Sequence, residues 1–139
     1  MSGRRPPRVN PGRVAAARVL LGVEGGAPAD DLLEQLAPQG RDRTLTWHLA
    51  LGVLRRQGSL DHVLRPFSRR SIESLDAPVR AVLRLGAFEL LYGRTLAHAA
   101  VHQAVDLARA LRLPLTRLDT ADPVEDVLPP LLREPAWAA

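Results

Sequence analysis

Apolar residues recur every three or four positions along most of the chain, which is the spacing of one helix face. The first such repeat begins after Asn10 and Pro11, a favourable N-cap and first-position pair, and stops at the glycines 25–26. The pattern predicts helices over residues 11–24, 29–37, 42–57, 59–67, 77–92 and 97–113. A further repeat at 124–132 is interrupted by Pro129 and Pro130, so we expect at most a broken final helix there.

The segment 42–57 is apolar on two sides, which predicts a central, buried helix. Gly58 is expected to end it, and Ser59 to cap the next helix. Asp76 is expected to cap the helix that follows and to pair with Arg80 one turn later.

Three glycines fall inside predicted helices, where each costs about 1 kcal/mol relative to alanine. They are Gly22, Gly52 and Gly86. We expect close approach between helices to offset this cost.

Composition narrows the class of protein. The 139 residues fit one domain, and with only five aromatic residues the core must consist of Leu, Val and Ala, which favours an all-α fold. The absence of cysteine excludes disulfides and thiolate chemistry. No apolar run reaches the roughly 18–20 residues of a membrane span, and the N-terminus lacks a signal-peptide pattern. We therefore expect a cytoplasmic protein that needs no cofactor.

The charges are unevenly distributed. All 19 basic residues are arginine, and residues 1–18 hold five of them with no acid. Residues 19–40 hold four acids and no arginine, residues 41–117 thirteen arginines and six acids, and residues 118–139 five acids and one arginine. A basic arm followed by a basic middle indicates a polyanionic partner. A solubilising tail is the alternative.

Five segments, in order and spacing, resemble the NusB-like domain. They are VAAARVL from Val14, GVLRR from Gly52, LDHVL from Leu60, VLRLGAFELLY from Val82 and AHAAVHQAVDLA from Ala97. This domain forms the NusB antitermination factor and the N-terminus of RsmB-type rRNA cytosine-5 methyltransferases. GVLRR and LDHVL are more similar to the methyltransferase version. The family's final helix resembles F-V-N-x-V-L-R-R, whereas PVEDVLPP stands in that place here.

The resemblance implies a bundle of about seven helices in two sub-bundles that binds RNA through its basic N-terminal surface. Residues 1–9, which contain Gly3, Pro6 and Pro7 among arginines and show no period, are expected to form a flexible basic arm. A helical domain (10–113) and a degenerate final helix with an acidic tail (114–139) are expected to follow. The resemblance also implies a protein partner, either a ribosomal protein like NusE or an rRNA methyltransferase. Such methyltransferases continue into a methyl-donor-binding domain with catalytic cysteines, so we expect this chain alone to be non-catalytic.

Carried over position by position, the RNA-contact candidates are Arg4, Arg5, Arg8 and Arg13, with Arg18 dependent on the rotation of its helix. Arg55 and Arg56 rank second. Charge alone adds the adjacent pair Arg69 and Arg70, in a loop expected to be exposed, although a merely solvated loop explains them equally well. Arg84, within a buried helix, is expected to be structural.

Other chemistry finds little support in the sequence. His98, His102 and Asp106 share one helix face, where a solvated surface is the simpler interpretation than a metal site. No phosphate-binding glycine loop or catalytic constellation is present. Four of the aromatic residues fall on apolar helix faces, namely Trp47, Phe67, Phe88 and Tyr92, so RNA affinity should be mostly electrostatic.

The leading hypothesis is an RNA-binding module that contacts rRNA or a nascent transcript, in antitermination or rRNA maturation. A protein–protein adaptor and the RNA-binding part of a split rRNA methyltransferase are the alternatives. A related hypothesis is that the acidic residues of 118–139 compete with RNA for the basic surface.

Overall fold

A computed structural model describes residues 9–93 and 96–111, and within these ranges every regular element is a helix. The α-helices are α1 (Pro11–Glu24), α2 (Ala29–Leu36), α3 (Arg41–Leu64), α4 (Ala77–Tyr92) and α5 (Ala97–Ala110). Two short 3₁₀ helices, η1 (Arg65–Phe67) and η2 (Ile72–Ser74), connect α3 to α4. The all-α prediction is confirmed. The predicted final helix, the acidic tail and all of the arm but Val9 lie outside the described residues.

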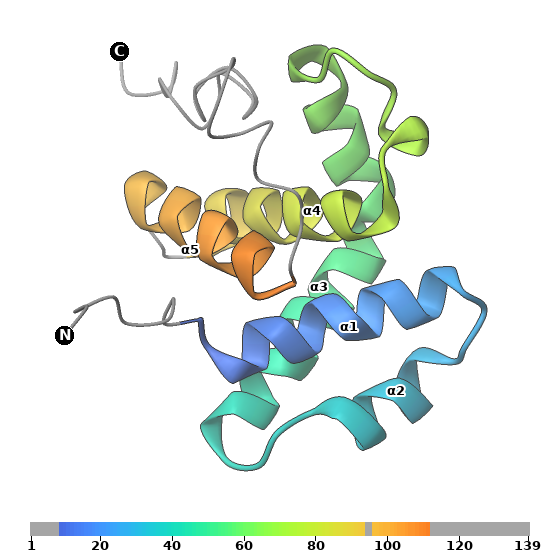
Figure 1. The fold of residues 1–139 in the computed structure, drawn as a ribbon, viewed down its shortest axis with the longest axis vertical. Coiled ribbons are helices and arrows are strands. Elements are labelled where there is room, and N and C mark those ends of the chain that lie inside the picture. Colours follow the sequence, from blue (N-terminus) through green and yellow to red (C-terminus); the bar gives the residue numbers. More distant parts are fainter. Residues whose placement is uncertain (1–8, 94–95, 112–139) are drawn as a thin grey trace, which may run out of the picture.

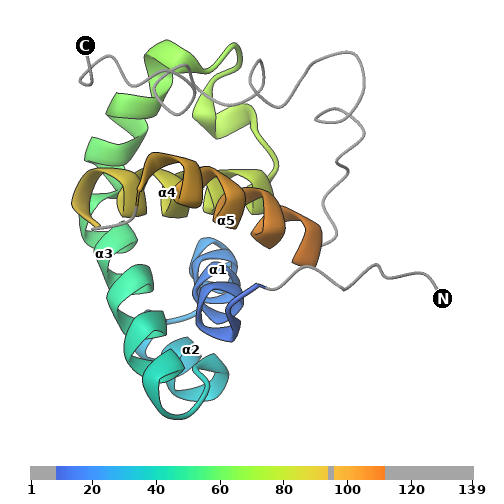
Figure 2. The same ribbon diagram turned by 90° about the vertical axis from the view of Figure 1, so that its left-hand side faces the viewer.

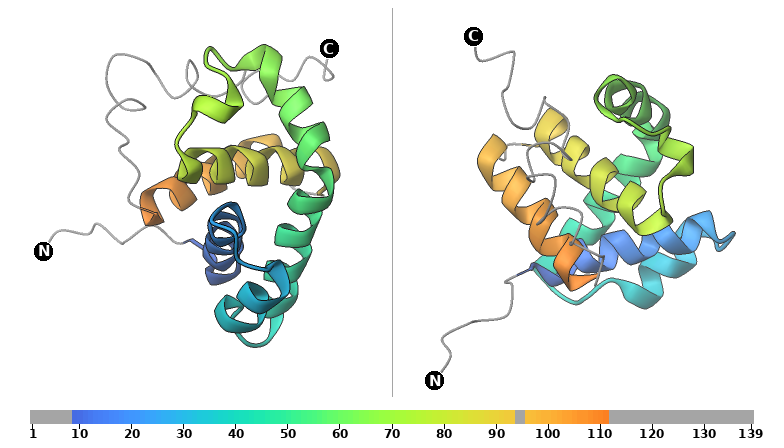
Figure 3. Two further views of the ribbon diagram at one scale, coloured as in Figure 1. Left: turned by 90° about the vertical axis from the view of Figure 1, so that its right-hand side faces the viewer. Right: turned by 45° about the horizontal axis from the view of Figure 1, so that its top comes forward.

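The long helix α3 is the element against which both α1 and α4 pack. Figure 2 shows it along one side of the molecule, with α1 and α2 beside its first half and α4 and α5 crossing farther along. Helix α1 contacts α2, α3 and α4, and α4 packs on both α3 and α5 (Figure 1). The views in Figure 3 also place α5 beside the start of α1. None of the helices in the described ranges has the length and hydropathy of a membrane span.

The core is aliphatic, as expected, and draws on every helix. Its largest fully buried side chains include Val19 of α1, Leu33 of α2, Val53 and Leu60 of α3, and Leu85 of α4. Phe88 of α4 is the only aromatic ring among the buried core residues of the described ranges. Burying a side chain of this kind contributes about 1.5–3 kcal/mol, so helix packing dominates the stability.

The predicted helix end at Gly58 is wrong. Helix α3 continues through Gly58 to Leu64, so the two predicted helices over 42–57 and 59–67 are one helix followed by η1. Gly58 is exposed, and its cost of about 1 kcal/mol is offset because Leu60 and Leu64 beyond it are buried in the core. Tertiary packing thus overrides the local stop signal.

At two of the three helical glycines, two helices approach each other closely, as predicted. A Cβ atom on Gly52 of α3 would collide with the ring of Phe88, and one on Gly22 of α1 would lie 2.6 Å from Leu32 Cδ1. The expectation is wrong for Gly86, where a Cβ would meet only Ala104 at an ordinary 3.7 Å.

Candidate nucleic-acid interface

The start of α1 is fixed firmly on the rest of the bundle. The Asn10 side chain caps the helix, as predicted, by accepting a hydrogen bond of 2.6 Å from the Gly12 backbone N–H. The hydroxyl of Thr46 in α3 is 3.1 Å from the Gly12 carbonyl oxygen, and the Thr46 side chain is fully buried. Helix α1 therefore begins at a defined point beside the first turn of α3.

Arg13 makes an internal ion pair. Its Nε and Nη2 donate to the two carboxylate oxygens of Glu89 in α4, at 2.9 and 2.8 Å. Both side chains are largely buried, with 16% and 9% of their surface exposed. Because the guanidinium is occupied by a buried carboxylate, Arg13 is a poor candidate for phosphate contact compared with the arginines before it.

The remaining predicted arginines within the described ranges are exposed. Arg18 lies on α1, Arg55 and Arg56 on α3, and Arg69 and Arg70 in the loop after η1. Within those ranges none of the five forms an ion pair, whereas Arg13, Arg43, Arg65, Arg80 and Arg84 each pair with an acid. Arg4, Arg5 and Arg8 lie outside the described residues.

Arg18 borders a shallow groove of about 370 Å³. Val14 of α1 and Leu36 and Pro38, at and after the end of α2, also line it. An apolar surface therefore lies next to the basic start of α1, on the side that faces α2.

Arg69 and Arg70 are far from this basic start. Gly12 of α1 adjoins residues 42–46 of α3, whereas the basic loop follows the end of α3 at Leu64 and η1. Some 20 helical residues at 1.5 Å each separate the two places by roughly 30 Å. The loop is ordered internally, because Arg70 Nη2 donates to the Ser74 carbonyl oxygen at 2.8 Å and Ser68 Oγ to the Arg70 carbonyl oxygen at 2.6 Å.

The expectation that Tyr92 lies on an apolar helix face is wrong, because half of its surface is exposed. Tyr92 ends α4, and its ring stacks on Phe88 with centroids 5.6 Å apart. The Arg56 guanidinium lies 4.5 Å from the Tyr92 ring centroid, in cation–π distance. The position of Tyr92 directly before Gly93, at the end of its helix, was the available signal for exposure.

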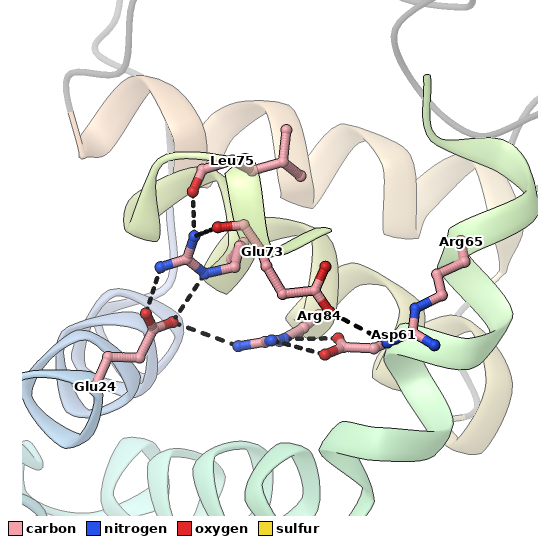
Figure 4. A network of polar contacts seen from close by, with 7 residues as sticks. Glu24, Asp61, Arg65, Glu73, Leu75 and Arg84 are labelled. Carbon is pink, nitrogen blue, oxygen red and sulfur yellow. Dashed lines mark hydrogen bonds and ion pairs between the residues drawn. The ribbon is translucent and has the colours of Figure 1, made fainter. Parts of the chain in front are cut away.

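Arg84 is structural, as expected. Its Nε and Nη2 donate to the two carboxylate oxygens of Asp61, both at 2.8 Å, and its Nη1 donates to Glu24 at 3.3 Å. Figure 4 shows Arg84 between these two acids, which come from α3 and α1. The charges of this cluster are thus satisfied internally and are not available to a ligand.

The predicted pairing of Arg80 with Asp76 is replaced by a pairing with Glu24 in the same cluster. Arg80 donates to the Glu24 carboxylate and to the carbonyl oxygens of Glu73 and Leu75, and the Asp76 side chain makes no capping hydrogen bond. The bond to Glu24 raises the pKa of Arg80. At the exposed edge, backbone hydrogen bonding at Glu73 and a bond from Arg65 lower the pKa of the Glu73 carboxyl.

No three His or acidic side chains within the described ranges are grouped so that they could hold a metal ion. This covers the helix face of His98, His102 and Asp106, all of which lie on α5.

Comparison with known proteins identifies two groups of relatives. The family model described as the NusB family matches residues 10–115. A ribosomal RNA small subunit methyltransferase B from Pseudomonas putida is 38% identical over 109 residues, which cover 76% of this chain and 25% of the methyltransferase. A transcription antitermination protein NusB from Xanthomonas axonopodis pv. citri is 43% identical over 63 residues, covering 45% of this chain and 40% of that protein. The chain thus spans about a quarter of the length of the methyltransferases it matches.

Proposed function

The chain belongs to the NusB family, and from this membership we propose that it is an RNA-binding module that contacts rRNA or a nascent transcript. Relatives named for transcription antitermination and for rRNA methylation support this proposal. Within it, the arm arginines Arg4, Arg5 and Arg8 hold phosphates. Arg18, which is exposed on α1, extends the basic surface.

The observation that carries the proposal is the division of the arginines into two sets. In the described ranges, five arginines form ion pairs with acids of the same chain, and the pairs of Arg13, Arg80 and Arg84 are largely buried, whereas Arg18 and the other exposed candidates have no such partner there. Unpaired guanidinium groups on a surface favour phosphate binding because they bring charge and up to five donors each. Association with a polyanion also releases counterions, which strengthens binding at low salt.

We also propose the finer architecture that the family implies, with about seven helices in two sub-bundles. The division into an arm (1–9), a helical domain (10–113) and a final segment (114–139) belongs to the same proposal. The family match over 10–115 supports the middle part.

Changing Arg4, Arg5 and Arg8 together to alanine is expected to weaken binding to single-stranded rRNA and to flatten its salt dependence. Each lost phosphate contact on a single strand should reduce the slope of log K against log salt by about 0.7, hence by about 2 for the three. Fluorescence anisotropy across a salt series measures both quantities. Arg13 is left in place because its loss would leave Glu89 buried without its partner.

The matched control changes Arg69 and Arg70 to alanine, which removes exposed charge roughly 30 Å away. If the slope of log K against log salt falls less per lost charge in this control than in the arm variant, the arm is supported as the principal site. Equal losses per charge would mean that affinity follows net charge alone. If the unaltered protein binds no RNA at low salt, the proposed function is wrong.

A second candidate function is docking to an rRNA methyltransferase, and the similarity to enzymes of that name favours it. The matched region covers about a quarter of the length of those relatives. We expect a purified rRNA methyltransferase to copurify with this chain after RNase treatment. If the two proteins no longer copurify after RNase treatment, RNA alone links them, and the docking proposal is wrong.

A further inference from the structure

We propose that the exposed ring of Tyr92, with the guanidinium of Arg56 against it, is a stacking platform for one unpaired RNA base. This inference rests on the RNA-binding function proposed above and adds a specific contact to it. Phosphate contacts by the arm hold the strand, and the platform receives a base.

Helix α3 builds one side of the platform through a spacing of four residues. His48, Gly52 and Arg56 lie one turn apart, and the Phe88 ring of α4 fits against the bare backbone of Gly52. His48 contacts this ring edge-on with centroids 5.5 Å apart, and the Arg56 guanidinium lies 5.9 Å from it. The buried Phe88 ring is thereby fixed from both directions.

Helix α4 then carries the aromatic surface outward. Tyr92 follows Phe88 by one turn and stacks on it with the two ring planes inclined at 30°. Phe88 is 2% exposed and Tyr92 50% exposed, so the pair runs from the core to solvent. An aromatic ring held in this way offers a stacking surface without needing to be ordered when the base arrives.

The surroundings of the ring favour a polyanion such as RNA over a basic or purely apolar partner. Arg55 and Arg56 are exposed, and within the described ranges neither forms an ion pair. The acid of the preceding turn, Glu89, is buried and neutralised by Arg13. Exposed Leu91 and Leu96 supply apolar surface beside Tyr92 in the sequence. Positive charge next to an aromatic face is the combination that binds single-stranded nucleic acids.

The platform lies near the root of the arm. The ion pair between Arg13 and Glu89 joins the first turn of α1 to the last turns of α4, and Tyr92 is three residues beyond Glu89. The start of α1, which the arm precedes, is therefore closer to Tyr92 than to the loop of Arg69 and Arg70.

The test compares two RNA probes of equal length, a single-stranded oligouridine and its abasic counterpart, which keeps the phosphates and lacks the bases. Changing Tyr92 to alanine is expected to weaken oligouridine binding roughly 5- to 100-fold with an unchanged salt slope, because a stacking contact and no phosphate contact is lost. The same variant should bind the abasic probe as the unaltered protein does. A purely structural role of Tyr92 would lower binding of both probes alike.

Two control variants accompany this test. Tyr92→Phe keeps the ring and should retain the affinity for oligouridine. Arg55→Ala removes a charge beside the platform without touching the ring, and should reduce the binding of both probes equally. Circular dichroism confirms that each variant keeps the helical content of the unaltered protein.

The inference is overturned if Tyr92→Ala binds oligouridine as tightly as the unaltered protein, while the arm variant still loses its salt slope. Loss of methyltransferase copurification in Tyr92→Ala with RNA binding intact would also overturn it, in favour of a protein contact. Absence of any RNA binding by the unaltered protein defeats the proposed function and, with it, this inference.

Discussion

Replacing Arg84 by alanine is expected to lower the free energy of unfolding by about 3–5 kcal/mol, because it leaves the charge of Asp61 uncompensated in a largely buried position. The Arg84 and Asp61 side chains are 9% and 13% exposed, and their two parallel hydrogen bonds of 2.8 Å replace most of the lost hydration. The total free energy of unfolding of a domain of this size is only about 5–15 kcal/mol. Urea denaturation followed by circular dichroism measures the change.

Two further variants isolate the cause. Arg65→Ala removes a partner of Glu73 from an exposed pair, 60% and 65% open to solvent, and should cost less than about 1 kcal/mol. The double change Arg84→Met with Asp61→Leu removes both charges and should recover much of the stability lost by Arg84→Ala. A loss from Arg84→Ala as small as that from Arg65→Ala would contradict the assigned role.

The second large effect is expected from Gly52→Ala. The added Cβ would overlap the Phe88 ring, which is enclosed in the core and cannot withdraw without moving α4. Overpacking of this kind costs about 3 kcal/mol, at the upper end of its usual range, and better helix propensity returns about 1 kcal/mol. A net destabilisation of about 2 kcal/mol should therefore appear in urea or thermal unfolding.

Gly86→Ala is the matched control, since Gly86 also lies inside a helix but has ordinary space around a new Cβ. It should be neutral or stabilise the protein by up to about 1 kcal/mol. If the two substitutions have the same effect, the contact between Gly52 and Phe88 does not determine how α3 and α4 pack.

The helices were largely predictable because their signals are local. Asn10 and Pro11 mark the start of α1, and the apolar repeat gives α2, α4 and α5 to within a few residues. Gly58 misled the prediction because the free energy that carries α3 past it comes from burying Leu60 and Leu64 against other elements. That burial depends on the tertiary fold, whereas the glycine is a local stop signal.

The ion pairs and exposed residues of the surface were less predictable, because the fold determines which acid lies next to each arginine. Arg13 pairs with a glutamate 76 positions away, and Arg84 binds residues 23 and 60 positions away. Local charge density therefore could not separate Arg13 from Arg18. For the same reason Tyr92 was assigned to an apolar helix face, although it lies at the point where α4 leaves the core.

The unbroken length of α3 also has a consequence for how long an RNA must be to use the whole basic surface. The helix holds the Arg69 and Arg70 loop roughly 30 Å from the root of the arm, and eight residues preceding that root span at most about 28 Å when fully extended. Under the proposed function, short oligonucleotides are therefore expected to engage the arm or the loop, one at a time. A strand long enough to bridge the gap makes its second contact at a high effective concentration, and its avidity should rise in a step as RNA length increases.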